Sequence, residues 1–342
     1  MERSDAVYMR RALELAANGL GSVSPNPLVG CVIAHNGRTI GEGWHMRFGG
    51  PHAEVNAVNQ VRDRSALKDS VVYVTLEPCS HYGKTPPCAD LLIECKVKKV
   101  VVCNADVNPL VSGRGIAKLR NAGIKVEENF LAEEGEEINR RFFTYFRKRR
   151  PYIVLKWAQT ADGFIARENY ESRWISNELS RKLVHKWRGE EDAVMVGSNT
   201  AHYDNPRLNV RDWTGRNPVR IVVDRHLRLS RNLNLFDGSQ RTIVYNLRES
   251  RAEGNLEYAA LDEGNFLQEL FSDLYRKQVQ SVMVEGGATL LNELIRLDLW
   301  DEARVFRSKV VFGKGVAAPD LGGAEISSED ILGDSLYCYR NR

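Results

Sequence analysis

A histidine, a glutamate and two cysteines in the first ninety residues have the types and the order of a catalytic zinc site. His52 and Glu54 stand in "PHAEV", and Cys79 and Cys88 stand in "EPCSHYGKTPPC". One imidazole and two thiolates give zinc three ligands and leave the fourth position of its tetrahedron for water. Glu54 is not needed as a ligand, so it can carry protons between that water and a substrate. These residues predict hydrolysis by a metal-activated water.

A structural zinc site and an accidental arrangement both account for this motif less well. A structural zinc would need a fourth protein ligand, and the nearby candidate, His81, stands in a segment typical of a surface loop. An accidental arrangement is disfavoured because "PHAE" begins one expected helix and the second cysteine precedes another. The order of the motif is that of zinc nucleobase deaminases, with a longer segment between the cysteines. That segment can wall a pocket, and its Lys84 can face a phosphate.

Helix and strand signals alternate around the motif over about the first 145 residues. A helix is expected over 4–19, with Ser4 as its N-cap and Gly19 after its end. A hairpin over 28–45 follows, with Asn36 and Gly37 at its turn. Periodicity then predicts helices and strands in alternation: helices over 53–61, 89–96 and 115–123, and strands over 71–76, 99–106 and 124–129. This pattern is typical of a sheet sandwiched between helices.

A charged segment over 133–151 closes the first half of the chain. It predicts one helix that ends in the basic run Arg147–Arg150, and Pro151 marks a domain boundary. For the basic run, a solvated helix end and linker is preferred over a nucleic-acid-binding patch. We therefore expect two domains, over residues 1–146 and 151–342.

The second half of the chain resumes the alternation and predicts a second α/β domain. The expected helices cover 176–189, with Ser176 as N-cap, 265–278 and 288–298; the expected strands cover 152–160, 192–200, 219–225, 242–246, 281–287 and 302–313. No G-x-G-x-x-G follows a strand, which argues against a Rossmann domain. A pair of glycines, Gly286-Gly287, instead stands between a strand and a helix, where backbone amides suit a phosphate, although many ordinary turns also use glycine pairs.

The bulk composition excludes several classes of protein. Of the 342 residues 43% are hydrophobic, which is too many for a disordered chain, and the net charge of +3 gives no strong attraction to nucleic acid or to an anionic membrane. No apolar run approaches the ~20 residues of a membrane helix, and the N-terminus lacks an apolar signal core. We expect a cytoplasmic protein with reduced cysteines, in which Cys31 and Cys103 are core residues.

Longer motifs in both halves resemble one known family. "SPNPLVGCVI", "GEGWH", "PHAE", "TLEPCSHYGKTPPC" and "NPLVSGRG" resemble the deaminase half of the bifunctional riboflavin-biosynthesis deaminase–reductases. "LKWAQTADGFIA", "ESRWIS", "DNPRLNVR" and "VEGGATL" resemble the reductase half, which is similar to dihydrofolate reductase. The resemblance runs from about residue 5 to about residue 315. It implies a cytidine-deaminase-like α/β/α domain followed by a dihydrofolate-reductase-like α/β domain.

The resemblance also implies the two reactions. The family deaminates 2,5-diamino-6-ribosylamino-4(3H)-pyrimidinone 5′-phosphate in a zinc site, with Glu54 as the proton carrier here. It then reduces the ribosyl chain with NADPH and gives 5-amino-6-ribitylamino-uracil 5′-phosphate. The implied partner is a free nucleotide, with no nucleic acid and no membrane, and the implied assembly is a homodimer or homotetramer.

Site residues are carried over from the family position by position. In the deaminase half, the implied substrate contacts are Asn26, His45, Lys84, Asp106 and Asn108. In the reductase half, the implied substrate contacts are Ser172, Arg188, Leu208, Arg211 and Glu285, and the implied NADPH contacts are Ala158, Trp174, Thr200, Asp204, Gly287, Ala288, Thr289, Leu290, Leu291, Asn292 and Glu293. Without the family, each has an ordinary structural role: turn and loop residues in the first half, surface arginines and core aromatics in the second. Arg188 and Arg211 suit a phosphate clamp, whereas the proton donor of the reductase is left open between Glu285 and water.

Two segments depart from the family pattern. "SNTAHYDNP" replaces the commoner "TVxxDDP" style, and Phe306-Arg307-Ser308 stands where an Ile-Ala-Pro-like stretch is usual. Two alternatives stay open, and the altered last strand bears on the second of them. One is a tRNA or free-base deaminase with an unrelated second domain, and the other is a zinc-stabilised binding module whose second half has lost catalysis.

Overall fold

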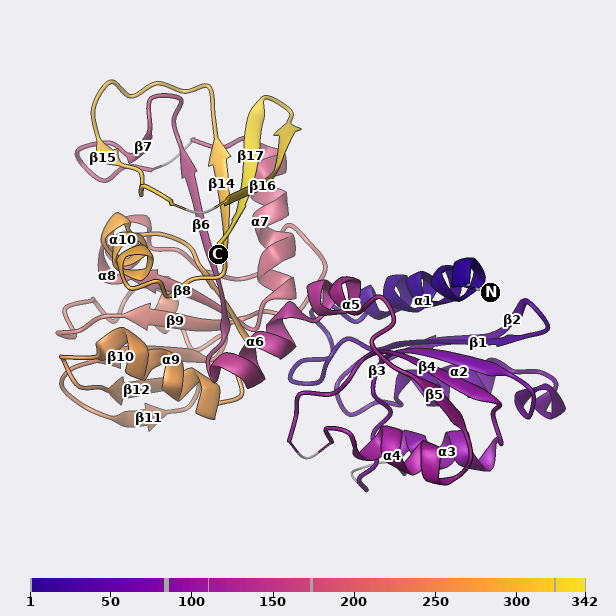
Figure 1. Cartoon of the computed structure of the whole chain (residues 1–342). Helices are drawn as coiled ribbons and strands as arrows, with labels where there is room; N and C mark the ends of the chain where they lie inside the picture. The colour runs from indigo at the N-terminus through magenta and orange to yellow at the C-terminus, as the bar shows by residue number, and fades with distance from the viewer. Residues whose placement is uncertain (1, 83–85, 110, 173–174, 323, 342) are drawn as a thin grey trace. The chain divides into compact units, whose positions relative to one another are not determined.

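The computed structural model describes residues 2–82, 86–109, 111–172, 175–322 and 324–341 (Figure 1). Two of the predicted site residues, Lys84 and Trp174, lie outside the described residues. The chain divides into two compact units, Met1–Lys148 and Arg149–Arg342. The division falls two residues before Pro151.

A five-stranded sheet is the centre of the first unit. Its strand order is β2-β1-β3-β4-β5, with β1 antiparallel to both β2 and β3 and with β3, β4 and β5 parallel. The strands are β1 (Gly30–His35), β2 (Arg38–Trp44), β3 (Val71–Leu76), β4 (Lys99–Asn104) and β5 (Lys125–Glu127). All five lie where the sequence predicts strands, and β3 has the predicted bounds.

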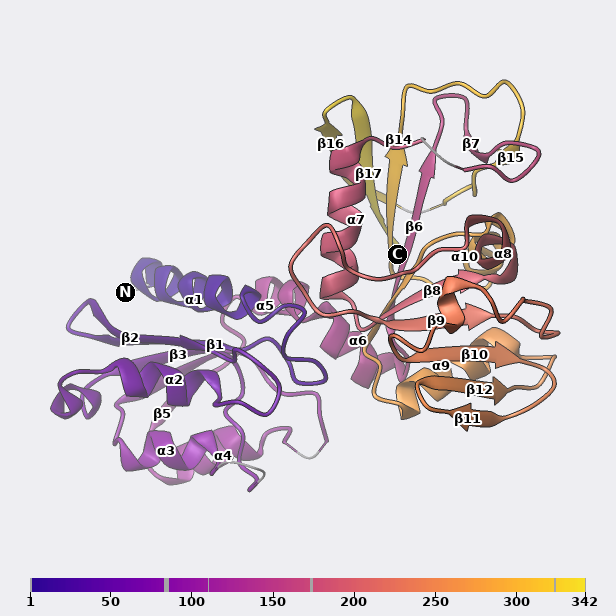
Figure 2. The same ribbon diagram turned by 180° about the vertical axis from the view of Figure 1, so that it is seen from behind.

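Helices cover both faces of this sheet, as Figures 1 and 2 show from opposite sides. On one face lie α1 (Glu2–Ala17) and α5 (Ala132–Ile138), and on the other lie α2 (Ala53–Gln60), α3 (Cys88–Glu94) and α4 (Arg114–Asn121). Successive side chains of a strand point to opposite faces. Accordingly, Val32 joins the core under α1 and Ile33 joins the core under α2 and α3. The predicted core cysteines, Cys31 and Cys103, are fully buried.

Glycines on β2 bring α2 close to the sheet. A Cβ atom added at Gly43 would lie 2.4 Å from the backbone nitrogen of Ala57 and 2.6 Å from the carbonyl oxygen of Ala53. A side chain at this position would therefore push α2 away. Since His52 and Glu54 stand at the start of α2, this close contact helps to set where they lie.

The charged segment before the boundary differs from the prediction. The expected single helix over 133–151 is two helices, α5 and α6 (Arg140–Lys148), because Asn139 leaves helical geometry between them. The Asn139 side chain is buried and exchanges two hydrogen bonds of 2.8 Å with the backbone of Leu28. At the end of the predicted solvated run, Arg150 is instead largely shielded from water and forms an ion pair with the buried Asp301 at 2.5 Å. The helix over 4–19 begins at Glu2 and ends at Ala17, so Ser4 is not its N-cap.

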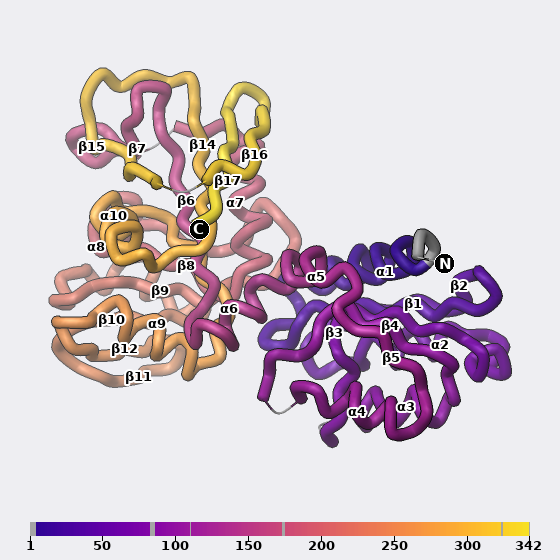
Figure 3. The backbone as a smooth tube through the Cα atoms, viewed as in Figure 1, coloured from indigo at the N-terminus to yellow at the C-terminus, as the bar shows by residue number. Residues whose placement is uncertain are grey.

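A ten-stranded sheet is the centre of the second unit, in the order β11-β12-β10-β9-β8-β13-β6-β14-β17-β16. The strands from β12 to β14 are parallel, and β17 returns antiparallel beside β14, as the yellow tube in Figure 3 shows. The bounds are β6 (Tyr152–Gln159), β8 (Ala193–Gly197), β9 (Val219–Val223), β10 (Thr242–Asn246), β11 (Arg251–Glu253), β12 (Leu256–Ala260), β13 (Ser281–Val284), β14 (Glu302–Arg307), β16 (Ala324–Ile331) and β17 (Asp334–Arg340). A separate two-stranded sheet joins β7 (Phe164–Ala166) and β15 (Val316–Ala317).

Helices also pack on both faces of the larger sheet. Side chains of α9 (Phe266–Arg276) and α10 (Ala288–Arg296) join one core, and those of α7 (Glu178–Glu190) and α8 (Ser198–Asp204) join the other. Two short 3₁₀ helices are η1 (Arg64–Leu67) and η2 (Asn234–Phe236).

Several predictions for the second unit are corrected by the structure. The N-cap of α7 is Asn177 rather than Ser176, because its side chain accepts a hydrogen bond from the Ser180 backbone at 2.9 Å. The segment 192–200, predicted as a strand, is β8 followed by α8, and β14 ends at Arg307 rather than continuing to 313. In the described part of the chain, no helix has the length and the apolar character that crossing a bilayer requires.

Candidate active sites

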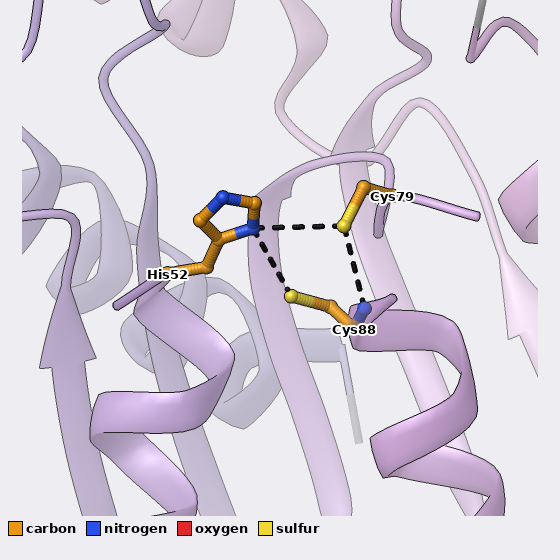
Figure 4. A group of neighbouring side chains, drawn as sticks. All are labelled: His52, Cys79 and Cys88. Carbon is orange, nitrogen blue, oxygen red and sulfur yellow. Dashed lines mark hydrogen bonds between the residues drawn. The ribbon is translucent and has the colours of Figure 1, made fainter. Parts of the chain in front are cut away.

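Three side chains converge in the first unit at the starts of two helices (Figure 4). His52 is the N-cap residue of α2, Cys88 is the first residue of α3, and Cys79 lies in the loop after β3. His52 Nδ1 lies 3.3 Å from Cys88 Sγ and 3.5 Å from Cys79 Sγ. The backbone N–H of Cys88 donates to Cys79 Sγ at 3.3 Å. The three predicted ligand atoms thus lie within 4.8 Å of one another.

These separations fit a tetrahedral zinc ion. With a Zn–N bond of about 2.0 Å and a Zn–S bond of about 2.3 Å, neighbouring nitrogen and sulfur ligands of a tetrahedron are about 3.5 Å apart. The observed distances of 3.3 and 3.5 Å lie close to that value. His81, the candidate for a fourth ligand, is exposed, and among the described residues it does not belong to the ligand cluster. The donor set therefore fits a catalytic zinc with one open position.

The electrostatics of the triad favour a thiolate. A hydrogen bond from the Cys88 thiol lowers the pKa of Cys79 to about 4, and the same bond raises the pKa of Cys88. The two sulfurs therefore share a single proton. The hydrogen bond to Cys79 also raises the pKa of His52. A divalent cation at this point would replace the shared proton and bind both sulfurs as thiolates.

Glu54 lies in the first turn of α2, two residues after the histidine ligand. Its side chain is buried, with 3% of its surface exposed. Burial raises the pKa of Glu54 to about 7, and the neighbouring Cys79 thiolate adds to that rise. A carboxyl group that titrates near neutral pH suits a general acid–base.

A chain of hydrogen bonds joins two of the predicted substrate contacts to the metal site. His45 Nδ1 donates to the carbonyl oxygen of Pro51 at 3.0 Å, so Nε2 is the acceptor for the Asn26 amide at 3.1 Å. The His45 ring stands edge-on to the His52 ring, with centroids 5.5 Å apart. Burial lowers the pKa of His45. The geometry therefore fixes a neutral imidazole in one tautomer beside the ligand.

The other two described deaminase contacts stand after β4. Asp106 is buried, and its Oδ1 accepts a hydrogen bond from the Asn108 backbone at 2.7 Å. Burial raises the pKa of Asp106 to about 6, and the negative charge of Cys79 contributes to the rise. The structure therefore brings Asp106 within electrostatic reach of the triad, whereas Lys84 lies outside the described residues.

A carboxylate that the sequence did not single out orders the loop around Asp106. Buried Glu77, two residues before the ligand Cys79, accepts hydrogen bonds from backbone N–H groups across the loop and the start of α4: those of Asp106 at 3.2 Å, Gly113 at 2.9 Å, Gly115 at 2.9 Å and Ile116 at 3.2 Å. Glu77 thereby links the metal-binding strand to the segment that carries Asp106. Its place in "TLEPC", between an apolar strand and a ligand, is the signal that could have identified it.

A large cavity of about 1270 Å³ lies in the second unit. Ligand pockets are usually about 300–1,000 Å³, so this cavity has room for two ligands side by side. Its lining includes most of the described residues that were predicted for the reductase: Ala158, Ser172, Arg188, Thr200, Asp204, Leu208, Arg211, Glu285, Gly287, Ala288, Thr289, Leu290 and Glu293. Leu291 and Asn292 are exceptions, because Leu291 is fully buried in the core and Asn292 is exposed outside the lining.

A buried ion pair is part of the lining of this cavity. Arg188 Nε and Nη2 donate to the two carboxylate oxygens of Glu285 at 2.5 and 2.8 Å. Arg188 Nη1 also donates to the carbonyl oxygen of Asn209 at 3.1 Å. Burial would raise the pKa of Glu285, but attraction to Arg188 outweighs it, and the net shift is downward. Arg188 is therefore not a surface arginine, and Glu285 is held as a carboxylate.

The glycine pair after β13 forms an open helix start that faces the cavity. Gly286 and Gly287 have φ values of 111° and 85°, which favour glycine, and Gly287 is the N-cap of α10 without a side-chain cap. A Cβ atom at Gly287 would lie 3.3 Å from the Thr200 hydroxyl oxygen. The uncapped N–H groups of α10 thus stand beside Thr200 in a place suited to a phosphate.

Comparison with known proteins gives a family match in each half of the chain. Residues 151–330 match the model of the RibD C-terminal domain, and residues 2–104 match the cytidine and deoxycytidylate deaminase zinc-binding region. The riboflavin biosynthesis protein RibD of Aquifex aeolicus is 40% identical over an aligned length of 352 residues, gaps included. The alignment covers 99% of this chain and 98% of the relative. The chain belongs to the RibD family. RibD of Escherichia coli is 37% identical, over 90% of this chain and 89% of its own.

Solved RibD structures have the same fold. A diaminohydroxyphosphoribosylaminopyrimidine deaminase/5-amino-6-(5-phosphoribosylamino)uracil reductase of Thermotoga maritima superposes with a TM-score of 0.91 at 39% identity, over 100% of this chain and 99% of its own. RibD of Acinetobacter baumannii superposes with a TM-score of 0.91 at 33% identity, over 99% of both chains. As a RibD protein, the chain is a bifunctional enzyme with a zinc-dependent deaminase and an NADPH-dependent reductase. The predicted cytidine-deaminase-like and dihydrofolate-reductase-like folds are confirmed.

The reductase cavity also contains charged residues that the sequence did not single out. Lys156 lines the cavity from β6, and burial lowers its pKa. A lysine inside the apolar strand "YIVLKWAQ" is the signal that could have identified it. Arg225, His226 and Arg228 line the cavity just after β9. The two arginines add positive charge to the lining, as a site for phosphorylated ligands requires.

The departures from the RibD pattern leave the last parallel strand in place. Phe306 is buried in β14, pairs with Ala158 of β6 and stacks on Trp187 with ring centroids 5.5 Å apart. Arg307 donates to the carbonyl oxygen of Ala161 at 2.8 Å. Through these contacts the fold accommodates the altered stretch.

Proposed function

We propose that each unit carries one of two successive reactions, with the site residues in the roles that their geometry supports. The first unit removes the 2-amino group of 2,5-diamino-6-ribosylamino-4(3H)-pyrimidinone 5′-phosphate. The second reduces the ribosyl chain of the product to the ribityl chain. The observation that carries the proposal is the triad of His52, Cys79 and Cys88 with buried Glu54 in one unit, and a separate two-ligand cavity in the other.

In the first reaction, water adds to the ring carbon that bears the amino group, and ammonia leaves. Zinc held by the triad would supply an acidified water at the open position. Glu54 takes a proton from that water and delivers it to the departing nitrogen, which its pKa of about 7 allows in both directions. The ring carbon loses its bond to the amino nitrogen and gains a bond to the water oxygen. Glu54 returns to its starting protonation state.

The remaining deaminase residues position the nucleotide. Asn26 and neutral His45 present fixed hydrogen-bonding groups beside the ligand His52. Asp106 and Asn108 stand on the loop that Glu77 holds against the metal-binding strand. Lys84, in the segment between the two cysteines, is proposed to face the 5′-phosphate.

In the second reaction, the ribosyl chain gains a hydride and a proton. NADPH, when bound, supplies the hydride. We propose that its phosphates lie at the open start of α10 beside Thr200 and Asp204, and that Ala158 and Trp174 contact it. Leu291 does not face the cavity. Among residues 287–293, the proposed contacts with NADPH are therefore made by the residues that line the cavity.

The nucleotide is proposed to lie against Ser172, Leu208 and Arg211, with the exposed Arg211 guanidinium on its phosphate. The low pKa of Glu285 makes it a poor direct proton donor. The carboxylate, held by Arg188, instead accepts a hydrogen bond from a water that delivers the proton.

An assay of both steps on one preparation tests the proposal. Ammonia release from the diaminopyrimidine nucleotide should require zinc, and NADPH oxidation should require only the deaminated product. Deamination without any dependence on zinc, or failure of NADPH to quench the tryptophan fluorescence, would contradict the assignment. We also propose a homodimer or homotetramer in the cytoplasm, where thiolate ligands stay reduced, and sedimentation of the purified chain tests the assembly.

A further inference from the structure

A tight turn at the edge of the reductase cavity contains a tyrosine in a conformation that favours glycine. The Tyr170 backbone N–H donates to the carbonyl oxygen of Arg167, and the Arg167 N–H donates to that of Glu171, both at 2.9 Å. These bonds describe a turn that ends in a residue of left-handed conformation, a position that glycine usually occupies. Tyr170 has a φ of 65°. For a bulky side chain this backbone conformation is unfavourable.

The Tyr170 ring lies on a second exposed tyrosine. The rings of Tyr170 and Tyr203 are stacked, with centroids 4.6 Å apart and planes inclined by 13°. They are 41% and 50% exposed, and both line the reductase cavity. Tyr203 is the next-to-last residue of α8, so the stack joins the turn to this helix. Stacking removes apolar ring surface from water and compensates for the unfavourable backbone.

A second link joins the same two segments. The Ser172 hydroxyl donates to Asp204 Oδ1 at 3.0 Å. Ser172 follows Tyr170 by two residues, and Asp204 follows Tyr203 directly, so the stack and the hydrogen bond lie side by side along the two segments. Ser172 and Asp204 are the proposed contacts of the nucleotide and of the dinucleotide.

We propose that Tyr170 and Tyr203 are positioning residues that set the affinity of the reductase for both of its ligands. The stack holds the turn against α8. It thereby keeps the Ser172 hydroxyl hydrogen-bonded to Asp204, in the position from which both residues contact the ligands. The inference rests on the proposed roles of Ser172 and Asp204. It follows that losing the rings weakens ligand binding even where the fold is not weakened.

The turn itself has other anchors that should survive removal of the ring. Asn169 Oδ1 accepts a hydrogen bond from the Glu171 backbone at 3.1 Å, and the Arg167 guanidinium lies 4.2 Å from the centre of the Phe312 ring. Tyr170→Gly also gives the backbone the residue that its φ favours. This variant therefore distinguishes an effect on ligand binding from an effect on stability, because it removes the ring stack and at the same time relieves the backbone strain.

The test compares Tyr170→Gly and Tyr203→Ala with Tyr170→Phe and Tyr203→Phe, which keep both rings. The measurements are the KM for the deaminated nucleotide, the Kd for NADPH from tryptophan fluorescence, the melting temperature and deaminase activity. Tyr170→Gly and Tyr203→Ala should each raise the KM and the Kd about five- to tenfold. Tyr170→Gly should melt no lower than the parent chain, and the double variant should bind no worse than Tyr203→Ala alone, since both remove one interaction.

The Phe variants should stay within about twofold of the parent, and all variants should deaminate normally. Normal KM and Kd in Tyr170→Gly would overturn the proposal, as would effects that multiply in the double variant. Ser172→Ala is measured in parallel. If its KM is unchanged, both the role of Ser172 and this inference are wrong; if its KM rises while Tyr170→Gly binds normally, only the positioning role is wrong.

Discussion

Arg188 and Glu285, 97 residues apart in the chain, form a buried two-pronged ion pair under the proposed substrate of the reductase. Their side chains are 11% and 7% exposed. A buried charge left without its partner is strongly destabilising. Glu285→Ala should therefore lower the free energy of unfolding of the second unit by about 3–5 kcal/mol and abolish NADPH oxidation. Urea unfolding measures the first effect, and undisturbed ammonia release is the control for the first unit.

The same pair predicts a dependence of stability on pH. Because Arg188 holds the pKa of Glu285 below its ordinary value of 4.5, the folded state binds this proton less readily than the unfolded state. The stabilisation is complete above that ordinary value and is lost as pH falls through the lowered one. Unfolding measured from pH 6 to pH 3 should show a shallower loss in Glu285→Gln than in the parent chain. If the free energy of unfolding falls with pH equally steeply in both proteins, the ion pair is not the source of this pH dependence.

Glu54→Gln should keep the metal and lose the reaction. The amide has nearly the shape of the carboxyl group but cannot carry a proton from water to the leaving nitrogen. Ammonia release should fall by at least about 10²–10⁴-fold, the usual contribution of a general acid–base. Zinc content should remain at the parent value, and NADPH oxidation with the deaminated nucleotide should be normal. Substantial turnover in this variant would contradict the role of Glu54.

Cys79→Ser should lose the metal. The pKa of Cys79, about 4, shows that its surroundings favour a thiolate, which serine cannot supply. Zinc content should fall well below that of the parent chain, ammonia release should stop, and the first unit should unfold at lower temperature. Removal of zinc from the parent chain with a chelator should reproduce these effects. Full zinc occupancy in Cys79→Ser would exclude Cys79 as a ligand.

Arg211→Ala should affect only reduction. The Arg211 side chain lines the cavity and is 55% exposed, with only a long contact of 3.5 Å to the Asp212 carboxylate, so its guanidinium is accessible to a ligand phosphate. Loss of one charged hydrogen bond should raise the KM for the deaminated nucleotide about 10–100-fold. Arg207→Ala, at another arginine of the same lining, is the matched control. A parallel fall in ammonia release would mean that the two sites are not independent.

The sequence predicted the elements whose signals are local. Strands β3 and β10 were predicted with their observed bounds, because each is a short run of almost entirely buried residues rich in β-branched and aromatic side chains. The metal triad was also predictable, since His52 and Cys88 stand at the starts of helices and Cys79 follows a buried strand, each within a short motif. Strand β16 was missed because six of its eight residues are exposed and it lacks an alternating apolar face.

Features that depend on distant contacts could not be predicted from the sequence. The helix break at Asn139 exists because its side-chain amide forms hydrogen bonds with the backbone N–H and carbonyl groups of Leu28, 111 residues away. Arg150 stands in a basic run of the sequence, and only folding places Asp301, 151 residues later, beside it. The role of Glu77 likewise emerges only from its hydrogen bonds to the backbone N–H groups of Asp106, Gly113 and Gly115, which follow it by 29 to 38 residues. In each case the hydrogen-bonding partner of a polar group is brought close only by tertiary folding, so local sequence patterns cannot predict it.

The distribution of the two sites along the chain has an evolutionary consequence. In the part of the chain that the structure describes, the three proposed metal ligands precede residue 89, and the residues that line the reductase cavity follow residue 155. A gene encoding this chain could be interrupted between the codons for Lys148 and Arg149 without separating Arg150 from Asp301 or dividing either set of catalytic groups. Fusion, fission and exchange of either half with another lineage are therefore open to such a gene, since the reacting side chains proposed for each reaction, among the described residues, all come from one half.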